Sequence, residues 1–184
     1  MVKRKRTDGT SSIPKSMRNS WRTPRRTFNR LDRIHHFKVD LAASEKNALC
    51  PLFITEEQNA LSSQCCWAKQ FWKLNQCSYE IVFGWANPPY NKLMAWFRKA
   101  DHETSRGLPF GVVMLVPAFN GESRWRKHVF GKASEIYVFT DRLCFGHPVT
   151  GIEDQQASFG SMAIVWRPRL SPDEYVRTQL TVLM

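Results

Sequence analysis

Long apolar runs are absent from this 184-residue sequence. The most apolar stretch, residues 110–119, has ten residues, whereas a helix that crosses a bilayer needs about 20. The N-terminus is basic, but it is not followed by the apolar segment that secretory signals contain. We therefore expect no membrane-spanning helix and no export, and we expect the protein in the cytoplasm of a bacterial or phage-infected cell.

Cysteine is scarce and irregularly spaced. The sequence has neither a C-x-x-C pair nor two histidines separated by three residues. Such spacing provides neither a disulfide framework nor the usual pairs of zinc ligands. We expect reduced thiols and no metal site. The cysteines are Cys50, Cys65, Cys66, Cys77 and Cys144.

Acidic residues are nearly missing from the N-terminal part of the chain. Residues 1–30 hold ten Lys and Arg and one acid, Asp8, so they carry +9 of the net charge of +11. A polyanion is the expected partner, and nucleic acid is the first candidate. Residues 1–20 are predicted to be a flexible basic arm, with a solubilising tail or a nuclear-import signal as alternatives. The residues predicted to contact phosphates are Lys3, Arg4, Lys5, Arg6, Arg22, Arg25 and Arg26.

The rest of the sequence alternates apolar runs with helical patterns. Continuous apolar runs predict strands that are buried on both faces, as in a parallel sheet, and the alternation favours an α/β fold with helices on both faces. Thr23 is expected to cap a helix that begins at Pro24, and Gly107 to end another. No role is assigned after residue 168, so residues 21–168 are the predicted domain and 169–184 a tail. Strands are predicted at 37–41, 52–55, 81–86, 112–116, 135–139 and 161–166, and helices at 93–107 and 122–132, with a short one within 59–78.

The tetrapeptide Asn87-Pro88-Pro89-Tyr90 directly follows a predicted buried strand and precedes a predicted helix. Ligands of open α/β sheets bind beyond the carboxyl ends of the strands, which is where this motif lies. Two prolines fix the backbone and remove two donors, Asn87 adds a side-chain acceptor, and Tyr90 adds a flat ring. Acceptors beside an aromatic face suit a planar group with an amino substituent. The motif therefore predicts a catalytic loop, although a simple proline-rich turn is an alternative.

Several blocks occur in an order that resembles one enzyme family, the phage-type, Dam-like DNA N6-adenine methyltransferases, which use S-adenosylmethionine (SAM). The resemblance covers residues 20–168. N-P-P-Y alone also occurs in methyltransferases of RNA bases or protein glutamine, whereas the ordered set is more specific. The blocks are Trp21-Arg22-Thr23-Pro24, Phe37-Lys38-Val39-Asp40-Leu41-Ala42-Ala43 with Asn47-Ala48, Asn87-Pro88-Pro89-Tyr90 with Trp96 and Lys99-Ala100, Val116-Pro117-Ala118, and Arg142-Leu143 with Phe145.

The resemblance implies a three-layer, Rossmann-like class I methyltransferase sheet, mostly parallel, with one antiparallel strand from residues 158–167. It implies that Asn87 and Pro88 bind the adenine amino group and that Tyr90 stacks on the extruded base, with Pro89 completing the catalytic block. Asp40 and Ala42 would lie at the SAM pocket. Thr23 and Pro24 would cover the methionine end of SAM, and Trp21 is a further expected cofactor contact.

Two further cofactor contacts are predicted on weaker grounds. Glu56 follows a predicted strand and is placed near the ribose hydroxyls of SAM, and Asn59 near its adenine. The glycine-rich loop that many methyltransferases carry after their first strand is replaced here by Ala42-Ala43-Ser44. Contacts to DNA bases are expected from residues near 56–80, 119–128 and 143–158.

The sequence thus predicts transfer of a methyl group from SAM to N6 of an adenine flipped out of DNA. Two alternatives stay open: methylation of an amino group on an RNA base, and a non-catalytic nucleic-acid-binding protein on the same fold. A cytosine-C5 mechanism is disfavoured because it uses a cysteine after proline, and the sequence contains no Pro-Cys pair.

Overall fold

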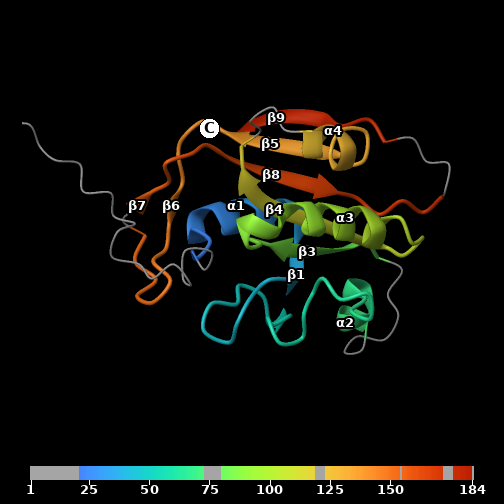
Figure 1. The fold of residues 1–184 in the computed structure, drawn as a ribbon, viewed down its shortest axis with the longest axis horizontal. Helices are drawn as coiled ribbons and strands as arrows, with labels where there is room; N and C mark the ends of the chain where they lie inside the picture. The colour runs from blue at the N-terminus through green and yellow to red at the C-terminus, as the bar shows by residue number, and fades with distance from the viewer. Residues whose placement is uncertain (1–20, 73–79, 119–122, 154, 172–175, 184) are drawn as a thin grey trace, which may run out of the picture.

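A computed structural model of the chain describes residues 21–183 except 73–79, 119–122, 154 and 172–175 (Figure 1). The predicted basic arm, with Lys3, Arg4, Lys5 and Arg6, lies outside the described residues. The helices are α1 (Arg25–His35), α2 (Trp67–Trp72), α3 (Leu93–Thr104) and α4 (Ser123–His128), with a short 3-10 helix, η2 (Tyr90–Lys92). The strands are β1 (Phe37–Asp40), β2 (Leu52–Phe53), β3 (Val82–Ala86), β4 (Phe110–Pro117), β5 (Glu135–Phe139), β6 (Cys144–Phe145), β7 (Gln155–Gln156), β8 (Ser161–Trp166) and β9 (Gln179–Leu183).

The main sheet has the strand order β2-β1-β3-β4-β8-β5-β9. All neighbouring strands run parallel except β8, which is antiparallel to both β4 and β5. Val113 lies opposite Val165, and Ile136 lies opposite Ile164. The predicted mostly parallel sheet, with its antiparallel strand inside residues 158–167, is confirmed.

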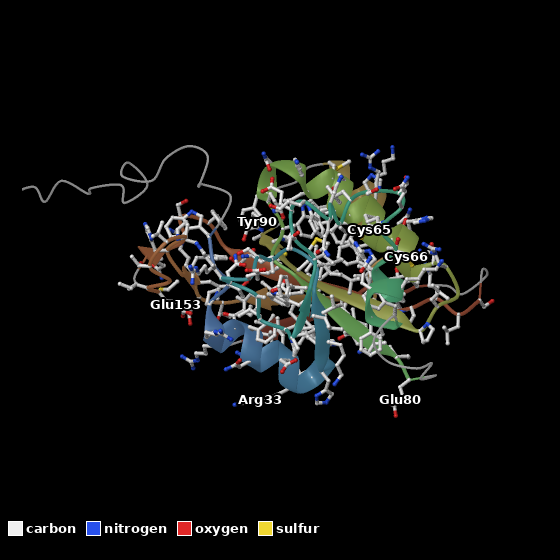
Figure 2. The ribbon with its side chains drawn as sticks, turned by 90° about the horizontal axis from the view of Figure 1, so that it is seen from below. Arg33, Cys65, Cys66, Glu80, Tyr90 and Glu153 are labelled. Atoms are coloured by element: carbon white, nitrogen blue, oxygen red, sulfur yellow. The ribbon has the colours of Figure 1, made fainter. Side chains whose placement is uncertain are left out.

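Helices cover both faces of the sheet, as predicted (Figure 2). Side chains of a strand alternate between faces, so the neighbours Val112 and Val113 enter different cores. Val113 packs in the core that contains Phe28 and Leu31 of α1. Val112 packs in the core that contains Phe97 of α3. The fold is therefore three-layered.

Helix α1 begins one residue later than predicted. Pro24, not Thr23, is the N-cap, with an extended backbone at φ −60° and ψ 127°, and it makes no side-chain cap. Proline fixes this φ, and its carbonyl oxygen accepts the first helical hydrogen bond, from Phe28, at 3.0 Å. Helix α3 ends at Thr104, before Gly107, which adopts φ +70° in the turn that follows.

The predicted C-terminal tail differs from the structure. Residues Gln179–Leu183 form β9, which pairs in parallel with β5 from Glu135↔Gln179 to Phe139↔Leu183. Four of its five residues are exposed because β9 is an edge strand. Leu180 and Val182 are among the exposed residues, so this segment lacks the buried apolar run by which β3, β4 and β8 were predicted. Within the described residues, no helix is long and apolar enough to cross a bilayer.

Candidate active site

The carboxyl ends of β2, β1 and β3 lie side by side at one edge of the sheet. Backbone hydrogen bonds continue the pairing beyond the strands: Ile54 donates to the Asp40 carbonyl oxygen at 2.8 Å, and Leu41 donates to that of Trp85 at 2.8 Å. Asp40 and Asn87, which the sequence places 47 positions apart, therefore end neighbouring strands. This is the edge at which ligands of open α/β sheets bind.

Asp40 shapes the turn that carries Ala42. Its side chain is buried, and its two carboxylate oxygens accept the N–H groups of Ala42 and Leu49, each at 3.2 Å. Burial raises the pKa of Asp40 to about 6, although the two backbone hydrogen bonds act in the opposite direction. Ala42 and Ala43 are half-buried in this turn.

The catalytic block predicted from sequence connects β3 to α3. Pro88 is buried, and the carbonyl oxygen of Pro89 accepts the N–H of Lys92 at 3.0 Å, which closes η2 at the start of α3. Because the prolines fix the backbone here, the chain turns from strand to helix with little freedom. Asn87 and Tyr90 are both half-buried at this turn.

The side-chain amide of Asn87 is held on both sides. Its Nδ2 donates to the carbonyl oxygen of Trp21 at 3.0 Å, and its Oδ1 accepts the hydroxyl of Tyr90 at 3.3 Å. An amide that donates from nitrogen to a carbonyl is fixed in one of its two flipped orientations. The Asn87 oxygen therefore faces the side of Tyr90.

An aromatic side chain from the segment before β8, two strands away from β3, lies beside Tyr90. Phe159, which precedes β8, meets the Tyr90 ring edge to face with the centroids 5.8 Å apart, and it also lies 6.3 Å from Phe145. Burial raises the pKa of the Tyr90 hydroxyl, so it stays protonated and acts as a donor. Figure 2 places Tyr90 on the α3 side of the sheet, opposite Arg33 of α1.

The segment Trp21–Pro24 runs from the Asn87 amide to the start of α1. Thr23 and Pro24 are buried, and Trp21 is half-buried. Arg22 pairs through its backbone with Gly146, and its guanidinium donates to the carbonyl oxygens of Pro148 and Val149 at 3.2 and 3.3 Å. The structure thus brings Trp21 to the predicted catalytic residue, while the side chain of Arg22 reaches the loop between β6 and β7.

Glu56 and Asn59 follow β2 in an exposed turn. Asn59 has a positive φ of +49°, and its carbonyl oxygen accepts the N–H of Ser62 at 2.9 Å. Asparagine tolerates this conformation better than most residues. Both side chains are exposed beyond the end of β2. The neighbouring strand in the sheet is β1, whose end carries the Asp40 turn.

A buried ion pair fixes the chain just after Asn59 to α3. The Lys99 ammonium contacts Glu103 Oε1 at 2.8 Å and donates to the carbonyl oxygens of Ser62 and Cys65 at 3.0 and 2.7 Å. Glu103 also accepts the N–H of Trp67 at 3.1 Å. Because both charges are buried and hydrogen-bonded, they define where this segment lies relative to the catalytic block.

A half-open cavity of about 260 Å³ lies at the carboxyl ends of β5 and β9. Arg26, Arg30 and Arg142 line it, together with Asp141 and Glu153. Arg25 and Arg26 are exposed in the first turn of α1, and Glu153 Oε1 accepts the N–H of Arg25 at 2.8 Å. The cavity thus has a basic excess at the same edge of the sheet as Asn87.

Sequence reasoning missed Phe159, His147, Glu153 and the Lys99–Glu103 pair. The signal for Phe159 was present, because an aromatic residue two positions before a strand that begins at the ligand edge is well placed to face the ligand. The other contacts join residues far apart in sequence. Burial raises the pKa of the Cys50 thiol to about 12, which keeps this thiol protonated at neutral pH. No cluster of metal-ligating side chains occurs among the described residues.

Comparisons with known proteins identify one family. A family model described as DNA N-6-adenine-methyltransferase (Dam) matches residues 10–182. The chain is similar to the DNA N-6-adenine-methyltransferase of Haemophilus phage HP1, with 27% identity over 162 residues that cover 86% of this chain and 84% of the relative. It is also similar to the DNA N-6-adenine-methyltransferase of Escherichia phage T1, with 30% identity over 179 residues that cover 89% of this chain and 68% of the relative.

Proposed function

The chain belongs to the DNA N-6-adenine-methyltransferase family, and on this basis we propose that it transfers a methyl group from SAM to N6 of an adenine flipped out of DNA. The observation that carries the proposal is the orientation of the Asn87 amide. Its nitrogen donates to Trp21, so its oxygen faces Tyr90, where an extruded base would stack. An adenine amino group offers donors and needs acceptors at that place.

Asn87 and Pro88 polarise the amino group of adenine. The Asn87 Oδ1 accepts one N6–H, and the carbonyl oxygen of Pro88 accepts the other. These hydrogen bonds increase the electron density on N6 and turn its lone pair out of conjugation with the ring, which makes N6 a usable nucleophile. With SAM bound, N6 would form the new bond to the methyl carbon as the bond between that carbon and the sulfonium sulfur breaks, and the sulfur would keep the electron pair as the thioether S-adenosylhomocysteine. The surplus proton of N6 leaves to water because neither amide oxygen is a base.

Tyr90 and Phe159 hold the base. The ring of Tyr90 stacks on the face of the flipped adenine, and Phe159, edge to face with Tyr90, limits the space around it. Extrusion is needed because N6 is not accessible to a closed pocket while the base is stacked in the duplex.

The residues at the ends of β2, β1 and β3 fit SAM. Glu56 and Asn59 follow β2, which is two strand steps of about 4.8 Å from β3, the strand that Asn87 follows, and the Asp40 turn at the end of β1 lies between the two strands. An elongated nucleoside can lie along such a row, with Glu56 at its ribose, Asn59 at its adenine, and Ala42 beneath it. Trp21, Thr23 and Pro24 cover its methionine end. When bound there, SAM supplies a methyl group already activated by its sulfonium.

DNA phosphates are contacted by the basic groups outside the pocket. Arg25 and Arg26 lie at the edge of the sheet from which the target base must enter. The arm residues Lys3, Arg4, Lys5 and Arg6 add charge just before them in the chain. Because its substrate is DNA in an infected or bacterial cell, the enzyme acts in the cytoplasm.

The test compares wild type and Asn87→Ala in methyl transfer to duplex DNA and to RNA of the same sequence, with N6-methyladenine measured by mass spectrometry. Wild type should methylate adenine in DNA. Asn87→Ala should lower kcat by two to three orders of magnitude, roughly the effect of losing one preorganised polar contact. SAM affinity, measured by calorimetry, should change little. Methylation of RNA alone, or wild-type turnover by Asn87→Ala, would refute the proposal.

A further inference from the structure

We propose that Arg22 is a positioning residue, which couples the loop between β6 and β7 (residues 146–153, called here the hairpin loop) to the acceptor oxygen of Asn87. The inference rests on the proposed function of Asn87. It differs from the expectation that Arg22 contacts a DNA phosphate, and the two roles make different predictions.

Arg22 is joined to the hairpin loop by four hydrogen bonds. Its backbone N–H and carbonyl pair with Gly146 in both directions at 2.9 Å. Its Nε donates to the carbonyl oxygen of Pro148 at 3.2 Å, and its Nη2 donates to that of Val149 at 3.3 Å. The planar fork of arginine can donate to two neighbouring carbonyls at once, which a lysine ammonium does less well. The guanidinium therefore fixes two successive residues of the loop.

The hairpin loop is itself folded tightly around this guanidinium. His147 Nδ1 accepts the N–H groups of Val149 and Thr150 at 3.2 and 3.3 Å, and His147 donates from its backbone to the Ile152 carbonyl oxygen at 2.9 Å. Gly151 adopts φ +74°, and a Cβ added to it would lie 3.1 Å from the Arg22 guanidinium. The loop therefore leaves no spare room at this contact.

The contact continues from Arg22 to the catalytic block through Trp21. The Trp21 carbonyl accepts the Asn87 amide at 3.0 Å, and the Trp21 ring meets His147 edge to face at 6.1 Å. If Arg22 is released, the Trp21 carbonyl moves, and the Asn87 amide can rotate. A rotated amide would present its NH₂ group to the adenine NH₂ group, and two donors do not bind each other.

The position of Arg22 also differs from that of the other arginines nearby. Arg22 is half-buried, whereas Arg25, Arg26 and Arg33 are exposed. If Arg22 is a positioning residue, replacement of its guanidinium lowers kcat even when the new side chain keeps the positive charge. A phosphate contact instead affects DNA affinity and its dependence on salt.

The experiment uses Arg22→Lys, which keeps the charge, and Arg22→Gln, which removes it, with Arg33→Lys as the control on the exposed side of α1. We expect kcat to fall about 10- to 100-fold in both Arg22 variants, because small misplacements of catalytic groups have effects of this size. The KM for DNA and the slope of log K against log salt should stay at their wild-type values. The side-chain amide resonances of Asn87 in NMR spectra should shift in Arg22→Lys and stay unchanged in Arg33→Lys.

A second pair of variants approaches the same contact from the loop. Gly151→Ala and Gly107→Ala impose the same positive φ on an alanine, but an added Cβ meets Arg22 only at position 151 and finds no atom within 4 Å at 107. Gly151→Ala should therefore lower kcat, and Gly107→Ala should lower only thermal stability. Wild-type kcat in Arg22→Lys would overturn the inference, as would a salt slope that falls by about 0.9 in Arg22→Gln with kcat unchanged. Absence of DNA methylation by wild type would instead refute the proposed function.

Discussion

The hydroxyl of Tyr90 donates to Oδ1 of Asn87 at 3.3 Å, the oxygen that we propose accepts the adenine amino group. An amide oxygen has two lone pairs, so this hydrogen bond leaves one acceptor site for the substrate. Tyr90 therefore has two separable functions in the proposed site. Its ring stacks on the base, and its hydroxyl helps to keep the amide in one orientation.

Substitution of Tyr90 separates these functions. Tyr90→Phe loses a hydrogen bond worth about 1 kcal/mol, so methylation should fall by less than about tenfold. Tyr90→Ala loses base stacking of roughly 1–3 kcal/mol, so methylation should fall about 10- to 100-fold. The loss in Tyr90→Ala should shrink when the target adenine is mismatched, because flipping then costs less. Equal damage in the two variants on matched and mismatched duplexes would show that stacking is not the contribution of Tyr90.

Asp40 should make stability depend on pH. In the folded protein burial raises its pKa to about 6, from 3.8 in the unfolded chain. Its contribution to the free energy of unfolding is therefore fully present below about pH 3.8 and is lost as the pH rises through about 6. The gap between the two pKa values corresponds to about 3 kcal/mol.

Comparison with Asp40→Asn isolates this effect. Burial lowers the pKa of His35 to about 4, so His35 destabilises the fold as the pH falls. If wild type is measured without a reference variant, this effect hides the opposite pH dependence that Asp40 gives to the free energy of unfolding. Denaturant unfolding should show that wild type gains stability relative to Asp40→Asn between about pH 7 and about pH 4. A difference that does not vary with pH would mean that Asp40 ionises normally in the folded protein.

Much of the sheet could be predicted from the sequence because its strands are apolar and continuous. The runs at β3, β4 and β8 are buried almost throughout, and each was predicted within two residues of its bounds. The antiparallel direction of β8 came only from the family resemblance. β9 was missed because Leu180 and Val182 face solvent at the edge, although they alternate with polar residues.

The residues of the catalytic block could also be identified, but their contacts could not. The Asn87 amide is oriented by Trp21, 66 positions earlier in the chain, and Phe159 comes to Tyr90 from 69 positions later. No local pattern encodes such contacts, because they arise only when β3, β8 and the segment before α1 meet at one edge of the sheet. The sequence predicted phosphate contacts for Arg22, Arg25 and Arg26 alike. In the structure Arg22 is half-buried, whereas the other two are exposed.

The basic arm is tested by deleting residues 2–18, which removes Lys3, Arg4, Lys5, Arg6, Lys15 and Arg18 with one acid, Asp8. If these cations bind phosphates, DNA affinity should fall. The slope of log K against log salt should become less steep by about 0.9 for each phosphate that is no longer neutralised. Turnover at saturating DNA should be retained. A truncated protein with the wild-type salt slope would identify the arm as a tail that does not bind DNA.

The cavity between α1 and the ends of β5 and β9 is tested with Arg26→Gln and Arg142→Gln combined. Both arginines are exposed at the edge of the sheet where the base enters, and removing two phosphate-binding cations should reduce the salt slope by about 1.8. Arg33→Gln, which removes one charge from the same helix outside the cavity, is the matched control and should leave the slope nearly unchanged.

The sheet also predicts where on the DNA these arginines act. Three strand steps, from β3 through β4 and β8 to β5, separate the strand that Asn87 follows from the strand whose end borders the cavity, an offset of about 14 Å across the sheet. Single neutral methylphosphonates introduced along the target strand should therefore weaken wild-type binding most at one position away from the target adenine, and not at the phosphates that flank this adenine. The double variant should not respond to the substitution at that position, because it no longer has the arginines that bind this phosphate. If wild type and double variant lose equal affinity there, the phosphate is bound by other residues, and the cavity has no part in DNA binding.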